Sequence, residues 1–204
     1  MKRTVMKLGP TGKLLLVALA AGALGVAVGL WREGPSPLLH TELGQRALQG
    51  AISATAPPPP SDLKIAKRGG IVPAFTLAAL DGRAVALPQA YAGRRVLLNL
   101  WASWCGPCVK EMPELDRFAR SQAPNGTQVV GIALDDAAAV EAFLRRIPVS
   151  YPLLVDTPGP RDAGVRLGNP KGVLPYSVLL DAEGRVLKQK IGPFRDGEID
   201  EWAR

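Results

Sequence analysis

The only two cysteines of this 204-residue chain, Cys105 and Cys108, are separated by Gly106 and Pro107 near the middle of the sequence. Two cysteines at this spacing can form a disulfide staple, supply half of a metal site or act as a redox pair. A small disulfide-stabilised domain would contain more cysteines and would pair distant ones. A structural zinc ion needs four ligands, and the only histidine, His40, lies far upstream. We therefore expect no bound metal and a redox pair that opens and closes in use.

The residues on either side of the cysteines predict a strand followed by a helix. Residues 94–102, RRVLLNLWA, contain an apolar run of strand length after the two arginines, typical of a strand buried on both faces. Residues 109–121 place apolar side chains at helical spacing. The helix therefore begins at or just before the cysteines, and Pro107 suits its first turn.

A helix start gives the first cysteine its reactivity. The unpaired N–H groups and the partial positive charge of a helix N-terminus stabilise an anion there. Because the thiolate is the nucleophile in disulfide exchange, we expect Cys105 to be the attacking group, exposed at the end of the strand. Cys108, one turn into the helix, can close a disulfide with Cys105 and resolve a mixed disulfide with a substrate.

Residues 66–204 are predicted to form one α/β domain, with a mixed sheet and helices on both faces of that sheet. Residues 72–87 contain two strand-like pieces around Asp81 and Gly82, which is a hairpin signal. Further strands are expected within 127–134, 151–156, 174–181 and 184–192, and further helices within 135–147 and 196–204.

The first 31 residues predict a basic cytoplasmic segment and a transmembrane signal-anchor. Residues 14–31 carry no charge, and four Lys or Arg residues precede them. As a helix this run spans roughly 27 Å, close to the hydrocarbon thickness of a bilayer. The positive residues place the N-terminus in the cytoplasm and the rest of the chain outside. A cleaved signal peptide stays open as an alternative, because Ala21, Gly22 and Ala23 offer a cleavage site.

Residues 32–65 predict a Pro-rich tether. Four consecutive prolines at 57–60 favour an extended polyproline II segment over a packed core. The net charge of +7 does not indicate a nucleic-acid partner, because residues 1–65 contribute +4 of it and the remaining basic residues are scattered.

The segment 99–115, NLWASWCGPCVKEMPEL, resembles the thioredoxin-like superfamily. More narrowly, residues 70–204 resemble membrane-anchored thiol-disulfide oxidoreductases of the TlpA/ResA/DsbE type. This resemblance implies a thioredoxin-like fold with an N-terminal β-hairpin and a TlpA-type insertion over residues 127–156, preceded by a transmembrane anchor.

The resemblance also implies roles for residues outside the two cysteines. It places Gly106 and Pro107 in the active-site loop and assigns Trp104, Leu174 and Pro175 to substrate binding. Pro175 corresponds to a cis-proline that faces the disulfide, with a trans proline at a strand start as the alternative. Leu174 stands where many relatives have threonine, so substrate fit at this point differs from theirs.

Glu111 corresponds to an acidic residue that lies near the cysteines in ResA-like proteins, and Pro113 to a proline that bends the active-site helix. One helical turn from Cys108, Glu111 could exchange a proton with that thiol. An exposed helix glutamate is the alternative. Asn99 replaces the buried aspartate of thioredoxins proper and cannot exchange a proton, which favours Glu111 as the catalytic acid.

The function implied by the resemblance is an exported, membrane-tethered protein-disulfide reductase that needs no cofactor besides its own disulfide. Its expected partners are disulfide-bearing exported proteins, with apocytochrome c among the candidates, a membrane thiol electron donor and the lipid bilayer. The catalytic domain would lie in the periplasm or extracytoplasmic space, held by a single pass through the inner membrane. Thiol oxidase or isomerase, thiol peroxidase and a non-catalytic tethered binding module stay open as alternatives.

Overall fold

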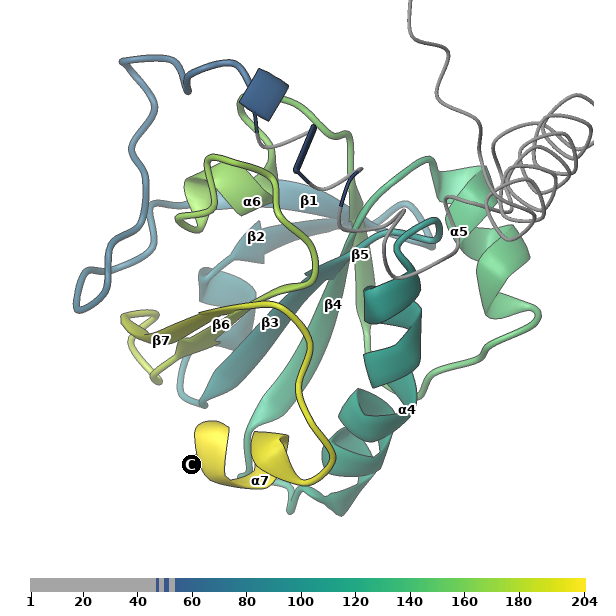
Figure 1. Ribbon diagram of the computed structural model, residues 1–204. Helices are drawn as coiled ribbons and strands as arrows, with labels where there is room; N and C mark the ends of the chain where they lie inside the picture. Colours follow the sequence, from purple (N-terminus) through teal and green to yellow (C-terminus); the bar gives the residue numbers. More distant parts are fainter. Residues whose placement is uncertain (1–46, 48–49, 52–53) are drawn as a thin grey trace, which may run out of the picture. The chain divides into compact units, whose positions relative to one another are not determined.

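The computed structural model of the protein describes residues 47, 50–51 and 54–204 (Figure 1). The predicted membrane anchor and most of the predicted tether lie outside the described residues. Among the residues that are described, no helix is long and apolar enough to cross a membrane.

A single mixed sheet of seven strands forms the centre of the described domain, in the order β2-β1-β5-β4-β3-β6-β7. Strands β3, β4 and β5 run parallel to one another, and β6 lies antiparallel to β3. The strands are β1 (Phe75–Ala79), β2 (Ala84–Leu87), β3 (Val96–Trp101), β4 (Gln128–Leu134), β5 (Leu153–Asp156), β6 (Tyr176–Leu180) and β7 (Val186–Ile191). The predicted mixed sheet is therefore confirmed.

Helices cover both faces of this sheet, with α4 and α5 on one side and α6 on the other (Figure 1). The helical elements are the 3₁₀ turn η1 (Gln89–Tyr91) and the helices α4 (Gly106–Ser121), α5 (Ala137–Leu144), α6 (Ala163–Arg166) and α7 (Glu198–Trp202). The short helix α6 was not predicted, because four residues are too few to show a helical period.

Strand β3 lies in the middle of the sheet, and all six of its residues are buried. Its neighbours β4 and β6 pair with it along its length, so side chains on both of its faces meet the core. This arrangement explains the continuous apolar run in the sequence. Asn99 is the one polar residue of the strand, and it is fully buried.

The β1–β2 pair is an antiparallel hairpin whose turn contains Asp81 and Gly82. Gly82 has a φ of 82°, a left-handed conformation that glycine adopts without a steric penalty. The Asp81 carboxylate accepts a hydrogen bond from the Arg83 backbone N–H at 3.0 Å, which closes the turn.

Residues before β1 contact the rest of the domain, and one of these contacts, made by Asp62, lies within the predicted tether. Asp62 forms an ion pair with Arg161, at 2.7 Å, and the Ala66 N–H donates to the carbonyl of Arg166 at 2.8 Å. Further along, Gly69 and Gly70 exchange backbone hydrogen bonds with Val186 at the start of β7. The chain therefore runs past α6 to the edge of the sheet before it enters β1.

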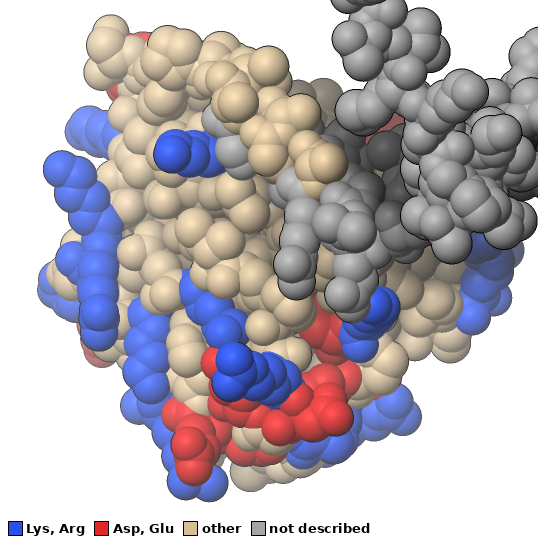
Figure 2. Space-filling view, in the orientation of Figure 1, with Lys and Arg blue, Asp and Glu red and all other residues tan. Residues whose placement is uncertain are grey.

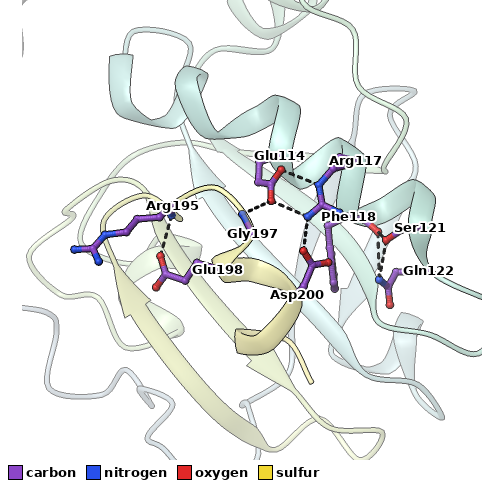
Figure 3. Close-up of polar contacts among 9 residues, drawn as sticks. All are labelled: Glu114, Arg117, Phe118, Ser121, Gln122, Arg195, Gly197, Glu198 and Asp200. Atoms are coloured by element: carbon purple, nitrogen blue, oxygen red, sulfur yellow. Dashed lines mark hydrogen bonds and ion pairs between the residues drawn. The ribbon is translucent and has the colours of Figure 1, made fainter.

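Polar contacts attach the C-terminal helix α7 to α4 (Figure 3). Arg117 of α4 bridges Glu114 and Asp200, with N–O distances of 2.7 and 2.6 Å. Glu114 also accepts a hydrogen bond from the Gly197 N–H, and these partners hold the pKa of its carboxyl at about 2. Figure 2 shows the resulting mixture of acidic and basic side chains on the surface over α7 and the end of α4.

Candidate active site

The two cysteines form a disulfide at the start of α4, with their Cα atoms 5.3 Å apart. Cys105 is the N-cap of the helix, and its Sγ accepts a hydrogen bond from the Cys108 N–H at 3.3 Å. Pro107 lies in the first turn, where its missing N–H costs no helical hydrogen bond. The predicted position of the redox pair at a helix start is confirmed.

The burial of Cys105 differs from the prediction. Both cysteines are fully buried in this disulfide form, so the expectation of an exposed Cys105 is wrong here. The N-cap geometry explains the difference, because the sulfur atom points back toward the first turn and is bonded to the buried Cys108. The exposed part of the motif is Trp104, of which 38% is accessible to solvent.

The second loop at the site contains Leu174 and Pro175, directly before β6. The peptide bond between them is cis, which confirms the expectation for Pro175. Because β6 is antiparallel to β3, with Tyr176 opposite Leu100, this loop lies at the sheet edge where β3 ends and the cysteine motif begins. The Gly192 N–H donates to the Pro175 carbonyl at 2.9 Å and connects the loop to the end of β7.

A largely apolar groove of about 320 Å³ joins these two loops. Trp104 and Leu174 line it together with Leu134, Val165 and the loop around Pro158. Residues 55–57 of the Pro-rich segment line it as well, which the sequence did not indicate. The groove therefore combines two predicted substrate-binding residues with a segment that was expected only to connect the domain to a membrane.

Glu111 lies on α4 with only 3% of its surface exposed, so the alternative of an exposed helix glutamate is wrong. One carboxylate oxygen accepts a hydrogen bond from Asn99 Nδ2 and the other from the Phe194 N–H, both at 2.8 Å. Burial raises the pKa of this carboxyl to about 7, although both hydrogen bonds oppose the shift. A group with this pKa can take up or release a proton near neutral pH.

Polar residues around Glu111 were missed as functional candidates. Asn99 also donates to Ser177 Oγ, at 3.1 Å. The Tyr151 hydroxyl is buried close by, and its burial, together with the nearby Glu111 charge, raises its pKa. A polar residue inside the apolar run within 94–102 was the available signal for Asn99. For Tyr151 and Phe194 the sequence offered no signal, since both come from segments distant from the motif.

A carboxylate also holds the segment that leads into the motif. Asp135, just after β4, accepts hydrogen bonds from the backbone N–H and the hydroxyl of Ser103, at 2.9 and 2.6 Å. These contacts connect the residues before Trp104 to the segment between β4 and α5. Within the described part of the chain, no cluster of three or more His, Cys, Asp or Glu residues could hold a metal ion.

Comparisons with known proteins find relatives that are thiol-disulfide oxidoreductases, in agreement with a disulfide at the site. Residues 67–202 match the family model described as Redoxin. The chain is 31% identical over 139 residues to the thiol-disulfide oxidoreductase ResA of Bacillus thuringiensis strain Al Hakam, covering 67% of this chain and 76% of that protein. It is 26% identical over 141 residues to the sporulation thiol-disulfide oxidoreductase A of Bacillus subtilis, covering 67% and 82%.

Solved structures show the same similarity. The crystal structure of StoA from Bacillus subtilis matches with a TM-score of 0.53 and 25% identity, over 66% of this chain and 98% of that one. A thioredoxin-related protein from Neisseria meningitidis serogroup B matches with a TM-score of 0.54 and 32% identity, over 61% and 93%.

Proposed function

The chain belongs to the Redoxin family and is a thioredoxin-like thiol-disulfide oxidoreductase of the TlpA/ResA/DsbE type, and from this premise we propose that it works as an exported, membrane-tethered reductase of protein disulfides. The observation that carries the proposal is the disulfide at the start of α4, with Cys105 as the N-cap. A helix start stabilises a thiolate at Cys105 once the disulfide is reduced.

The proposed reaction consists of two exchanges. The Cys105 thiolate attacks one sulfur of a substrate disulfide and releases the other substrate sulfur as a thiolate. The Cys108 thiolate then attacks Cys105 Sγ in the mixed disulfide, which closes the Cys105–Cys108 disulfide and releases the second substrate thiolate. The substrate gains two electrons, and a dithiol donor must return two electrons to the protein before the next cycle.

Cys108 must lose its proton before it can attack, and Glu111 is the proposed acceptor. Glu111 lies three residues after Cys108 on the same helix, and both side chains are buried. With a pKa of about 7, the carboxyl is partly charged at neutral pH and can take the thiol proton.

The groove between the two active-site loops is the proposed contact for the substrate. Trp104, which precedes Cys105 in the chain, and Leu174 offer apolar surface to the groove, and cis-Pro175 directly follows Leu174. An extended polypeptide segment on either side of a substrate cysteine fits an apolar groove with this location.

The location and the partners also belong to the proposal. The uncharged run at 14–31 supports a single-pass anchor in the inner membrane with the catalytic domain on the extracytoplasmic side. Exported disulfide-bearing proteins, with apocytochrome c among them, would be the substrates, and a membrane thiol protein would supply electrons. An oxidising compartment requires such a supply for any reductase.

The reduction potential of the full-length chain tests the direction of electron flow. The purified protein is equilibrated in dithiothreitol redox buffers, and the reduced fraction is measured by thiol alkylation. A potential near the roughly −270 mV of thioredoxin, or lower, is the expected result. A potential near the roughly −120 mV of a strong periplasmic oxidant would contradict the reductase proposal and favour a thiol oxidase.

A further inference from the structure

We propose that Asn99 is a positioning residue for Glu111, whose side-chain amide orients the carboxyl and stabilises its charged, proton-accepting form. This inference rests on the proposed role of Glu111 in the reductase cycle. It gives a function to a residue that, by its chemistry, cannot exchange a proton itself.

The geometry places three separate elements around the Glu111 carboxyl. Asn99 of β3 donates to one oxygen, and the Phe194 N–H, from the segment between β7 and α7, donates to the other. The second N–H of the Asn99 amide donates to Ser177 of β6. Asn99 and Ser177 are paired across β3 and β6, so the sheet itself fixes the amide. The carboxyl is thus held between the sheet and the C-terminal segment.

A buried amide at this position lowers the stability of the fold, and its role as a hydrogen-bond donor to Glu111 explains why it is there. Asn99 is fully buried in a strand whose other residues are apolar, and its Oδ1 has no hydrogen-bond partner among the described residues. A buried acceptor without a partner destabilises a fold, and a leucine would avoid that cost. The hydrogen bond from Nδ2 to Glu111 is the contact that a leucine could not make.

Other groups near Glu111 cannot replace this donor. Lys190 of β7 and Glu198 of α7 both act on the carboxyl through their charges, but they are paired with each other at 2.7 Å and their effects oppose. The Tyr151 hydroxyl is buried within reach of the Glu111 charge, but it makes no hydrogen bond within the described part of the chain. Cys108 carries no charge in the disulfide. Asn99 is therefore the side chain that donates directly to the carboxyl.

For the reaction, the Asn99 hydrogen bond affects how readily Glu111 accepts the proton of Cys108. In the resolving step, the proton leaves Cys108 Sγ for a Glu111 carboxylate oxygen, which yields a thiolate and a neutral carboxyl group. A hydrogen bond donated to the carboxylate favours its charged form. Without the Asn99 donor, the carboxyl would hold its proton to higher pH and would be available as an acceptor in fewer molecules.

The test compares the titration of the Glu111 carboxyl in full-length variants. Carbon-13 NMR follows the carboxyl signal against pH in the disulfide form, and Glu111→Gln assigns the signal. In Asn99→Leu the midpoint should rise by about one pH unit, a tenfold change in proton affinity. Ser177→Ala, which removes the other partner of the amide, is the matched control and should leave the midpoint near that of the wild type. Asn99→Ala carries the same expectation if Asn99→Leu does not fold.

A kinetic measurement separates positioning from general stability. The rate at which Cys108 resolves a mixed disulfide is followed by stopped flow, and its pH profile should shift upward with the carboxyl midpoint in the Asn99 variants. A variant that folds and titrates like the wild type would overturn the inference while leaving the reductase proposal intact. A wild type that reduces no disulfide would overturn the reductase proposal, and the NMR titration would still decide whether Asn99 sets the proton affinity of Glu111.

Discussion

The sulfur atom of Cys105 accepts a hydrogen bond from the backbone N–H of Cys108, so the first cysteine of the motif is also the cap of the helix that carries the second. One residue therefore supplies the proposed nucleophile and completes the first turn of α4. The same N–H that stabilises the helix end also stabilises negative charge on the sulfur.

The thiol pKa of Cys105 in the reduced protein should consequently lie below the ordinary value of about 8.5 for a free cysteine. The pH dependence of iodoacetamide alkylation measures it, with Cys108→Ser preventing disulfide closure.

Cys105→Ser keeps an oxygen cap and should unfold at a denaturant concentration close to that of the reduced wild type. Cys105→Ala removes the cap and should lose about 1 kcal/mol of stability. Equal stability of the two variants would contradict the capping role.

Glu111 should make the stability of the protein depend on pH. Burial raises its pKa from 4.5 to about 7, so the native state binds the proton more tightly than the unfolded state. Stability should therefore fall as the pH rises from about 4.5 to 7, by about 3 kcal/mol in total. Urea unfolding at pH 4.5 and 7.5, compared between the wild type and Glu111→Gln, isolates this contribution. If both proteins lose the same stability, the raised pKa is wrong.

Trp104 should act on the binding of protein substrates. It is the exposed residue of the motif, directly precedes Cys105 and lines the groove. Trp104→Ala should raise KM for a disulfide-bearing protein several-fold, whereas the reduction of a small aromatic disulfide should change less. Ile71→Ala is the control, because Ile71 is also exposed but pairs with Arg185 near the start of β7. If Trp104→Ala impairs the reduction of both substrates equally, Trp104 affects the reactivity of the cysteines and not the binding of protein substrates in the groove.

Gly131 should not tolerate a side chain. It lies opposite Asn99 in β4, and a Cβ atom there would overlap the end of the Leu153 side chain and come within 3.1 Å of the Tyr151 ring and 3.3 Å of Trp101 Nε1. Gly131→Ala should destabilise the protein by about 1–3 kcal/mol through overpacking, measured by urea unfolding. Gly159→Ala, at a position with open space around it, is the matched control and should change stability little. A neutral Gly131→Ala would show that Leu153, Tyr151 and Trp101 can make room for a methyl group.

Much of the local structure followed from the sequence, because it depends on neighbours along the chain. The apolar run within 94–102 became the buried strand β3, and the Cys-Gly-Pro-Cys segment became the start of α4. The predicted turn at Asp81 and Gly82 formed between β1 and β2. Hydrophobic period, helix capping and turn chemistry act over a few residues and can be read without knowing the fold.

The environment of the active site was decided only by the tertiary structure. The sequence placed Glu111 one turn after Cys108, but it did not determine whether that side of α4 faces water. Packing of α4 on the sheet buries Glu111 and brings it to Asn99, 12 residues away, and to Phe194, 83 residues away. The pKa of a carboxyl depends on its burial and its donors, and here both are contributed by segments that meet only in the folded protein. Thus the sequence alone identified the redox pair, whereas the fold determined the proton affinity of the acid beside it.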